Sequence, residues 1–496
     1  MLTALNIRQI GLIAGLLSFV VAIQLPPPTD LTQQGWLVLA IAVWMAIWWM
    51  TEAVPIAVTA MVPLVLFPLL DLGTITSVGG QYGSKVVFLI FGGFVIGLAI
   101  QRCNLHLRIA MKTVKFAGTE PKRVVGGFMI ASAFLSMWIT NTATTVMMLP
   151  IAYSVALLIN SESKTEPRAD TNFGSSLMLG LAYGASIGGM MTLVGTATNV
   201  MFKGYFEDNY GVEISFLDWM LVAVPIGLTL LVIVWWVLTS VLFPCKKEGH
   251  QGISEIVDAK INELGDMSTA ERRTLFVFLL TVSLWIGKGF IEPFIGDLRI
   301  NDSSIAIFGA ILLFIIPADW KQGIFLLEWG DTKNLPWGIL LLLGGGLALA
   351  GAMDSFGVAH WIGSKLTLFN DIPSWLLVLI TVTMIILLSE LMSNVATLTA
   401  FLPVIVAVAI GYGEHPFLLA LPAALAASCA FMLPIGTPPN AIVFGSGLIS
   451  IPQMARTGLL LNIIAILILT FMCFGLATLV FDIDAGVLPT IFEAHG

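Results

Sequence analysis

Two short polar segments recur inside an otherwise apolar chain. They occupy residues 135–150 and 388–403, so matching positions lie 253 residues apart, and both carry serine, asparagine, alanine, threonine and proline in the same order. Each is followed by a second matching block, at residues 195–199 and 436–440. Polar clusters that occur twice in apolar sequence predict one binding centre built from two repeats, which is the architecture of a secondary transporter.

The oxygen-bearing residues of the first segment suit a small monovalent cation. Ser136 and Thr140 lie four residues apart, so on a helix their hydroxyl groups share one face. Together with Asn141 and the backbone at Gly195 they would form an oxygen cage for a hard cation. The second segment repeats this arrangement with four equivalent residues: Ser389, Ser393, Asn394 and Gly436.

A helix end inside the membrane also offers partial charges. Where one short helix ends, free carbonyl oxygens favour a cation, and where the next begins, free N–H groups favour an anion. Thr142, with Asn141 and Asn394 facing it, would therefore hold an anion between the two segments. A simpler interpretation is that these side chains only hydrogen-bond neighbouring helices. Because both clusters are duplicated where a helix breaks, the pattern favours binding.

The composition is that of an integral membrane protein. Of the 496 residues 58% are hydrophobic and only 10% are charged, whereas a soluble domain carries about 25% charged residues. A helix needs about 20 apolar residues to cross a bilayer. We identify eleven transmembrane stretches: 10–25, 35–50, 54–70, 85–100, 175–202, 216–243, 275–292, 303–317, 337–353, 417–443 and 457–481. Two further apolar stretches, 124–158 and 373–412, are interrupted by the polar segments.

Basic residues predict the orientation, because basic loops face the cytoplasm. Two connections are rich in them: the first carries Arg102, Arg108, Lys112, Lys115, Lys122 and Arg123, and the second Lys246, Lys247, Lys260, Arg272 and Arg273. The stretch equivalent to the first connection, residues 354–372, has only Lys365 and two aspartates, which suits the outer face. We therefore expect a multi-pass protein of the cell inner (plasma) membrane, with a cytoplasmic N-terminus and the C-terminus outside.

The two interrupted stretches then enter from opposite faces, which predicts two re-entrant helical hairpins. Five spans per repeat is an odd number, so the second repeat is expected to be inverted relative to the first. The all-α chain divides into a first transmembrane helix (1–34), repeat 1 (35–243, with hairpin 124–158 and broken helix 175–202), a cytoplasmic linker (244–274), repeat 2 (275–481, with hairpin 373–412 and broken helix 417–443) and a C-terminal tail (482–496). Irregular backbone cannot face lipid, so the hairpin tips should meet the broken helices near the midplane.

The paired motifs, together with Thr51-Glu52-Ala53-Val54-Pro55, resemble those of the divalent anion/sodium symporter family of INDY-type dicarboxylate carriers, over about residues 35 to 480. The resemblance implies a homodimer with a scaffold domain and a transport domain that moves as an elevator. It assigns one sodium ion to Ser136, Thr140, Asn141 and Gly195, and a second to Ser389, Met392 (backbone), Asn394 and Gly436. It assigns the substrate to Asn141, Thr142, Asn394, Val395, Thr196, Thr437 and Pro438.

Three positions depart from the family pattern. Thr140 replaces a serine but keeps the hydroxyl group. Val395 replaces a second threonine and removes a hydrogen-bond donor, which changes how a site discriminates among oxyanions. Ala197-Thr198 stands where the second block has Pro438-Pro439, and its effect on the broken helix stays open. Dicarboxylates, tricarboxylates and sulfate-like anions therefore remain candidates.

We predict a sodium-coupled symporter that imports small divalent anions, with C4-dicarboxylates such as succinate, malate and fumarate as the favoured substrates. No arginine or lysine lies among the site residues, so bound sodium would balance the dianion; we expect electrogenic transport with at least two cations per dianion. The alternatives are a sodium-independent exchanger or proton-coupled carrier, a passive channel, and a membrane enzyme, for which no nucleophile–base or metal constellation is visible. No nucleic-acid partner is expected.

Glu390 beside the second cation site either titrates during transport or, as we favour, is a structural carboxylate bonded to backbone.

Overall fold

The computed structural model describes residues 6–162, 167–245, 251–295, 300–366 and 372–493, and most of these are helical. The first half of the chain contains α1 (Ile7–Ala22), α2 (Gln33–Thr51), α3 (Ile56–Thr59), α4 (Val62–Leu69), α5 (Ile75–Tyr82), α6 (Lys85–Arg102), α7 (Leu105–Ala117), α8 (Pro121–Ser136), α9 (Asn141–Glu162), α10 (Pro167–Met190), α11 (Ala197–Tyr210) and α12 (Phe216–Trp236), which continues as a π-helical segment, Val237–Leu242.

The second half contains α13 (Gln251–Leu264), α14 (Thr269–Ile295), α15 (Asp302–Ile315), the antiparallel strands β1 (Pro317–Asp319) and β2 (Ile324–Phe325), a 3-10 helix (Trp329–Asn334), α16 (Trp337–Ser355), α17 (Val358–Leu366), α18 (Ser374–Ser389), α19 (Asn394–Gly411), α20 (Phe417–Ala426), α21 (Pro438–Phe444), α22 (Ile451–Ile468), a second π-helical segment (Leu469–Cys473), α23 (Phe474–Val480) and α24 (Thr490–Glu493).

Within the described residues, eight helices are long and apolar enough to cross a membrane. Six of them coincide with predicted spans, and the other two, Asn141–Leu158 and Asn394–Gly411, lie in the predicted hairpins. The predicted span over 54–70 is divided into α3 and α4 by a short turn at residues 60–61. Pro63 has no N–H group to donate to the carbonyl of Thr59, and in the turn the hydroxyl of Tyr82 donates to the carbonyl of Ala60 at 2.5 Å.

The order of elements in the first half recurs in the second. α6 and α7 precede the pair α8–α9, the pair α10–α11 and then α12 with its π-helical end. In the same order, α16 and α17 precede α18–α19, α20–α21 and α22 with a π-helical end. Each half therefore contains a helical hairpin followed by an interrupted helix, at the positions of the two polar motifs.

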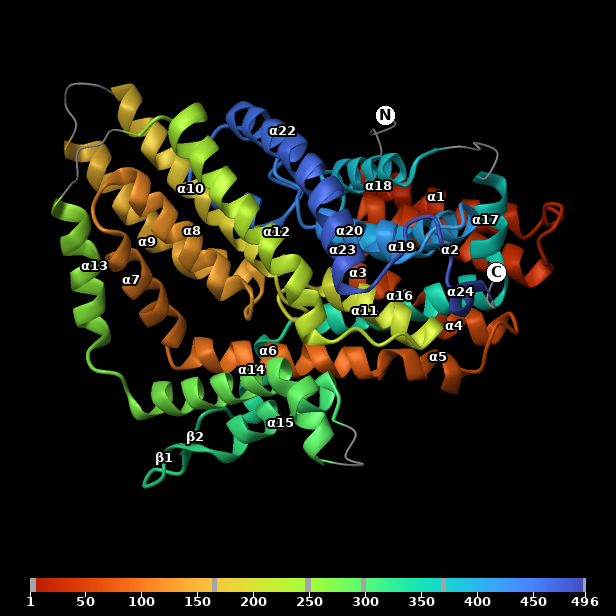
Figure 1. The fold of residues 1–496 in the computed structure, drawn as a ribbon, viewed down its shortest axis with the longest axis horizontal. Coiled ribbons are helices and arrows are strands. Elements are labelled where there is room, and N and C mark those ends of the chain that lie inside the picture. The colour runs from red at the N-terminus through yellow and green to blue at the C-terminus, as the bar shows by residue number, and fades with distance from the viewer. Residues whose placement is uncertain (1–5, 163–166, 246–250, 296–299, 367–371, 494–496) are drawn as a thin grey trace, which may run out of the picture.

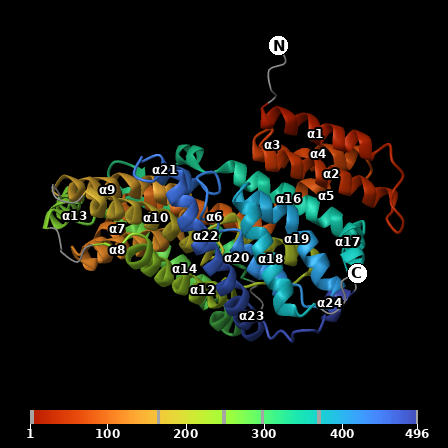
Figure 2. The ribbon, with the colours of Figure 1, turned by 90° about the horizontal axis from the view of Figure 1, so that it is seen from above.

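The first helices and the first hairpin lie at opposite ends of the molecule. Helices α1 to α5 gather at one end, and α7, α8, α9 and α13 lie at the other (Figures 1 and 2). Helix α10 packs against both helices of the first hairpin, α8 and α9, and α20 packs against both helices of the second, α18 and α19. The second helix of each hairpin packs against the interrupted helix of the other half: α9 contacts α21, and α19 contacts α11.

The predicted linker 244–274 contains α13, which is fastened to its neighbours. Arg108 of α7 forms a buried ion pair with Glu271 at the start of α14, with 2.6 Å between Nε and Oε1. The same guanidinium donates to the carbonyls of Leu264 and Gly265 at the end of α13, at 3.1 and 2.8 Å. The linker thereby ties α7, the helix before the first hairpin, to α14. Lys246 and Lys247 lie outside the described residues.

The described part of the predicted C-terminal tail packs against the protein. The ring of Phe492 is buried and lies 5.0 Å from the ring of Tyr210 and 5.2 Å from that of His415. The N–H of Gly486 donates to Glu414 at 2.9 Å. The tail therefore connects the end of α11 with the connection between α19 and α20.

Candidate functional site

The first hairpin turns at residues 137–140, which we call tip 1. Ser136 is the last residue of α8 and Asn141 the first of α9, and the Ser136 hydroxyl donates to Asn141 Oδ1 at 2.5 Å. Thr140 Oγ1 accepts from the N–H of Ala143 at 3.3 Å. The hydroxyl of Thr145 donates to the carbonyl of Asn141 at 2.8 Å. The structure therefore brings three predicted cation ligands together at one helix junction.

The interrupted helix of the first half passes beside tip 1. Its non-helical residues 191–196, which we call break 1, follow Met190. A Cβ atom on Gly189 would lie 2.2 Å from Asn141 Oδ1, and one on Gly195 would lie 2.3 Å from the carbonyl oxygen of Gly189. Only glycine permits these approaches. Asn141, the end of α10 and the backbone at Gly195 thus form one compact cluster.

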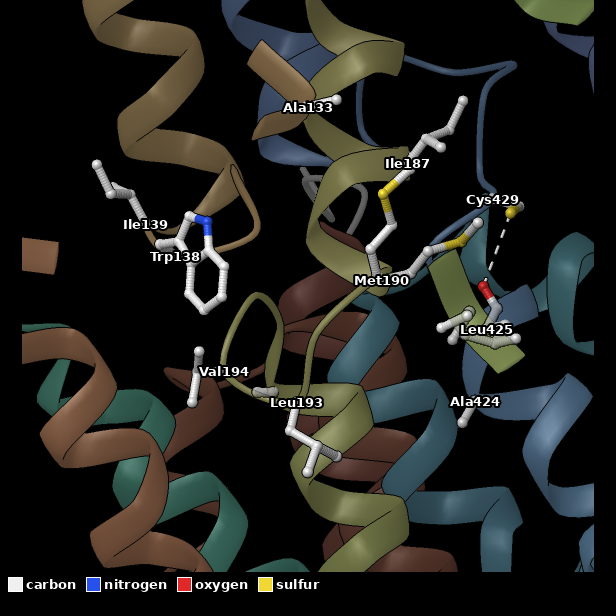
Figure 3. Packing of buried hydrophobic residues seen from close by; sticks show 14 of the residues in the cluster. Ala133, Trp138, Ile139, Ile187, Met190, Leu193, Val194, Ala424, Leu425 and Cys429 are labelled. Atoms are coloured by element: carbon white, nitrogen blue, oxygen red, sulfur yellow. Dashed lines mark hydrogen bonds between the residues drawn. The ribbon is translucent and has the colours of Figure 1, made fainter. Parts of the chain in front are cut away.

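Break 1 is held by side-chain amides and hydroxyls. Asn199 Nδ2 donates to the carbonyls of Gly189, Met190 and Thr192, at 3.1, 3.3 and 2.7 Å. The hydroxyl of Thr192 donates to the carbonyl of Met137 in tip 1 at 2.5 Å. Figure 3 shows Leu193 and Val194 of break 1 between Trp138 and Ile139 of tip 1 on one side and Leu425 of α20 on the other.

The second hairpin turns at residues 390–393, which we call tip 2. Ser389 Oγ and Asn394 Oδ1 are buried here and have no hydrogen-bond partner among the described residues. Buried oxygen atoms without a partner are costly, and oxygen atoms are the ligands that hard cations prefer. Met392 is a buried tip residue whose N–H group donates to Leu388. Tip 2 therefore presents unpaired oxygens where the sequence predicts the second sodium ion.

Break 2, residues 427–437, interrupts the helix of the second half. Asn440 Nδ2 donates to the carbonyls of Ala430 and Leu433, both at 3.1 Å, as Asn199 does in break 1. Glu390 accepts from the N–H groups of Met432 and Leu433 at 2.8 and 3.0 Å. A Cβ atom on Gly436 would lie 3.0 Å from Glu390 Oε2. Tip 2 and break 2 are therefore joined through Glu390.

Glu390 has the backbone-bonded geometry that we favoured for it. Besides the two N–H groups, it accepts from Asn462 Nδ2 of α22 at 2.7 Å. Three donors on one buried carboxylate explain why a charged residue is tolerated inside the protein. The equivalent residue in tip 1 is Met137. A methionine side chain has no carboxylate, so tip 1 cannot bind its break in the way that Glu390 does.

Replacing Glu390 with glutamine is expected to weaken sodium binding. The NH2 group of the glutamine amide cannot accept the hydrogen bonds that the carboxylate accepts. At least one buried donor would lose its partner, which costs about 1–3 kcal/mol. We expect the sodium concentration for half-maximal uptake to rise about tenfold, measured in proteoliposomes. Glu52→Gln is the control, because Glu52 is exposed and lies 3.4 Å from Arg8. Wild-type sodium dependence in Glu390→Gln would contradict this role.

The predicted anion-binding residues lie at the helix starts that face these junctions. Thr142 is exposed in the first turn of α9, and Asn394 and Val395 are half-buried in the first turn of α19. Thr196 and Thr437 precede α11 and α21, and Pro438 is exposed. Among the described residues no hydrogen bond joins tip 1 to tip 2. The structure thus places two separate polar clusters, linked by packed helices.

Lys203 is the cationic residue on α11, two helical turns beyond Thr196. Its ammonium group is buried and is paired with Glu207 at 2.8 Å and with Asp302 at 3.0 Å. These two carboxylates neutralise the positive charge of Lys203. Lys203 is therefore not needed to balance the charge of a bound dianion, which agrees with bound cations in that role.

Two polar residues of the site were missed from the sequence. Tyr183 of α10 donates to the carbonyl of Phe431 at 2.8 Å, and Asn462 of α22 contacts both Glu390 and the N–H of Phe431. An asparagine inside the apolar stretch 457–481 is a signal that could have been used. Tyr183 gave no such signal, because tyrosine is common in membrane helices.

Comparison with known proteins decides the family. The model of the sodium:sulfate symporter transmembrane region matches residues 7–480. The chain belongs to this symporter family. The resemblance to divalent anion/sodium symporters is thereby confirmed, and the match extends to the first helix. Membership makes the chain a multi-pass membrane transport protein and not an enzyme.

Relatives within the symporter family are similar over nearly their whole length. The sodium-dependent dicarboxylate transporter SdcS of Staphylococcus saprophyticus is 40% identical over 484 residues, covering 97% of this chain and 93% of the relative. SdcS of Staphylococcus aureus is 40% identical over 481 residues, covering 96% and 92%.

Two solved structures have a similar fold at low sequence identity. Neisseria gonorrhoeae MtrF matches with a TM-score of 0.59 at 12% identity, over 97% of this chain and 96% of that one. The Alcanivorax borkumensis YdaH transporter matches with a TM-score of 0.54 at 14% identity, over 82% and 89%. These likenesses support the fold of a polytopic helical transporter.

Proposed function

We propose that this protein is a sodium-coupled symporter that imports C4-dicarboxylates such as succinate, malate and fumarate. The observation that carries the proposal is the duplicated junction of a hairpin tip with an interrupted helix, at which the predicted sodium ligands gather. The two SdcS proteins, 40% identical over almost the whole chain, are named sodium-dependent dicarboxylate transporters, which favours dicarboxylates over sulfate.

Each sodium ion would bind where a hairpin meets a break. The first would contact Ser136, Thr140, Asn141 and the backbone at Gly195. The second would contact Ser389, Asn394 and the backbones at Met392 and Gly436. Unpaired Ser389 Oγ and Asn394 Oδ1 support the second site, since a cation satisfies both oxygens. At the first site a cation would compete with the Ser136–Asn141 hydrogen bond.

The dianion would lie between the starts of α9 and α19, contacted by Asn141, Thr142, Thr196, Asn394, Val395, Thr437 and Pro438. Helix N-termini attract carboxylates, and sodium would supply the positive charge that no lysine or arginine of the site supplies. Binding of each ion then favours the other, and this effect is reciprocal. Two sodium ions on one dianion carry no net charge, so electrogenic transport requires a third.

We further propose two inverted repeats, eleven membrane spans, an elevator movement and a homodimer. The repeated order of elements and the contacts of α9 with α21 and of α19 with α11 support the repeats. The basic connections support a cytoplasmic N-terminus and a C-terminus outside. In this arrangement the two junctions would move together across the membrane with the bound ions.

A competition assay tests the substrate class. Purified protein in proteoliposomes takes up labelled succinate in sodium buffer, and unlabelled malate, fumarate, citrate or sulfate is added outside. We expect malate and fumarate to inhibit the uptake of labelled succinate. When potassium replaces sodium, we expect no uptake of labelled succinate at all. Inhibition by citrate or sulfate alone would mean that Val395 has reshaped the site, and sodium-independent uptake would indicate the exchanger or proton-coupled carrier.

A further inference from the structure

Break 2 is a stretch of non-helical backbone whose first five residues, 427–431, are buried, so N–H and C=O groups there need partners from elsewhere. Four polar side chains from four different elements supply them. Asn440 holds the carbonyls of Ala430 and Leu433, and Glu390 holds the N–H groups of Met432 and Leu433. Between them, the N–H of Phe431 donates to Asn462, and its carbonyl accepts from Tyr183.

Phe431 is the point where these contacts meet. Its N–H donates to Asn462 Oδ1 at 3.3 Å, and Asn462 in turn donates to Glu390 of tip 2 at 2.7 Å. Its carbonyl accepts from the hydroxyl of Tyr183 at 2.8 Å. The rings of Tyr183 and Phe431 also lie 4.8 Å apart. Phe431 is thus linked through Asn462 to tip 2 on one side and bonded to α10, an element of the other half, on the other.

Helix α10 carries this contact to the first cation site. Tyr183 is fully buried and lies six residues before Gly189, about 9 Å along the helix. Gly184 and Gly188 let α10 approach α8 closely. Cβ atoms at these positions would lie 2.4 Å from Ser132 Oγ and 2.1 Å from the carbonyl oxygen of Ala133. α10 therefore cannot shift without moving tip 1, and Gly189 at its end touches Asn141.

We propose that Tyr183 is a positioning residue that couples the two sodium sites. Sodium at the second site orders tip 2 and break 2, and break 2 then fixes the carbonyl of Phe431. The Tyr183 hydroxyl binds this carbonyl and holds α10, and with it Gly189 and break 1, in the arrangement that binds the first sodium ion. Occupation of one site lowers the free energy needed to order the other, so sodium binds cooperatively.

Tyr183→Phe isolates this contact, because the ring keeps its packing and only the hydroxyl group is lost. The inference rests on the proposed sodium symport. In proteoliposomes we expect the variant to show a sodium Hill coefficient that falls toward 1 and a half-saturating sodium concentration raised roughly 2- to 10-fold. At saturating sodium, the half-saturating succinate concentration should change by less than about twofold, which a general loss of structure would not reproduce.

Tyr153→Phe on α9 is the matched control, since it removes the hydroxyl of a half-buried tyrosine on a neighbouring helix; it should retain the wild-type Hill coefficient. If Tyr183→Phe unfolds in a thermal assay, Asn462→Ser decides the matter, because it breaks the same chain between Phe431 and Glu390 and should also reduce cooperativity.

An unchanged Hill coefficient in a folded Tyr183→Phe variant would overturn the inference. A wild-type Hill coefficient of 1 would overturn it as well, and would leave sodium symport intact. Wild-type uptake that does not respond to sodium would instead reject the proposed function itself.

Discussion

Alanine in place of Asn394 or Asn141 is expected to abolish sodium-driven uptake at sodium concentrations that half-saturate the wild type. Each amide oxygen stands at a hairpin tip as a cation ligand, and loss of a hydrogen-bonding partner for a charged group costs about 1.5–3 kcal/mol. This corresponds to a roughly 10- to 100-fold rise in the sodium requirement. Asn394 should show the larger effect, since its oxygen is unpaired, whereas Asn141 accepts from Ser136.

The measurement is initial uptake of labelled succinate into proteoliposomes across a range of sodium concentrations. Asn209→Ala provides a control, because Asn209 lies near the far end of α11 and its amide donates to the carbonyl of Tyr205 at 3.0 Å. If both tip variants keep sodium-driven uptake with unchanged affinity, the site has been placed wrongly.

Gly189→Ala should have an effect of similar size although it adds only a methyl group. The new Cβ atom would lie 2.2 Å from Asn141 Oδ1 and 2.9 Å from its Cγ, so the asparagine or the end of α10 must move. Overpacking of this kind costs about 1–3 kcal/mol, and here the strain falls directly on the first cation site. We expect sodium affinity to fall about tenfold or more, with a lower unfolding temperature.

Gly174→Ala on the same helix is the matched control. A Cβ atom there would meet Leu448 at 3.7 Å, an ordinary contact, and alanine is favoured over glycine in a helix by about 1 kcal/mol. This variant should transport like the wild type and be equally or more stable. Wild-type sodium dependence in Gly189→Ala would show that the close approach to Asn141 has no role in binding.

Much of the site follows from the two polar motifs. Ser136 and Asn141 were assigned to one cation site, and the structure places them in hydrogen-bond contact. The expectation that Ser136 and Thr140 share one face of a helix is wrong, because α8 ends at Ser136 and Thr140 lies in the turn. The blocks at 195–199 and 436–440 were expected to interrupt helices, and Asn199 and Asn440 close these interruptions with the same pattern of amide bonds. Local sequence suffices here because each asparagine and the carbonyls that it binds lie at most ten residues apart.

Contacts between distant elements could not be obtained in this way. The bond from Tyr183 to Phe431 joins residues 248 positions apart, and no pattern within either segment predicts it. The same holds for Arg108, which binds Glu271 and the end of α13, and for Phe492, which packs against His415. The turn that divides 54–70 into α3 and α4 is bonded by Tyr82, which lies beyond that stretch. Such contacts arise from packing and need the folded chain.

The most direct test of the central claim is uphill accumulation of labelled succinate by wild-type protein in proteoliposomes, with an inward sodium gradient and with equal sodium on both sides. We predict transient accumulation above the external concentration under the gradient and simple equilibration without it. Equal accumulation in both conditions would contradict sodium coupling and would favour an exchanger or a carrier driven by another ion.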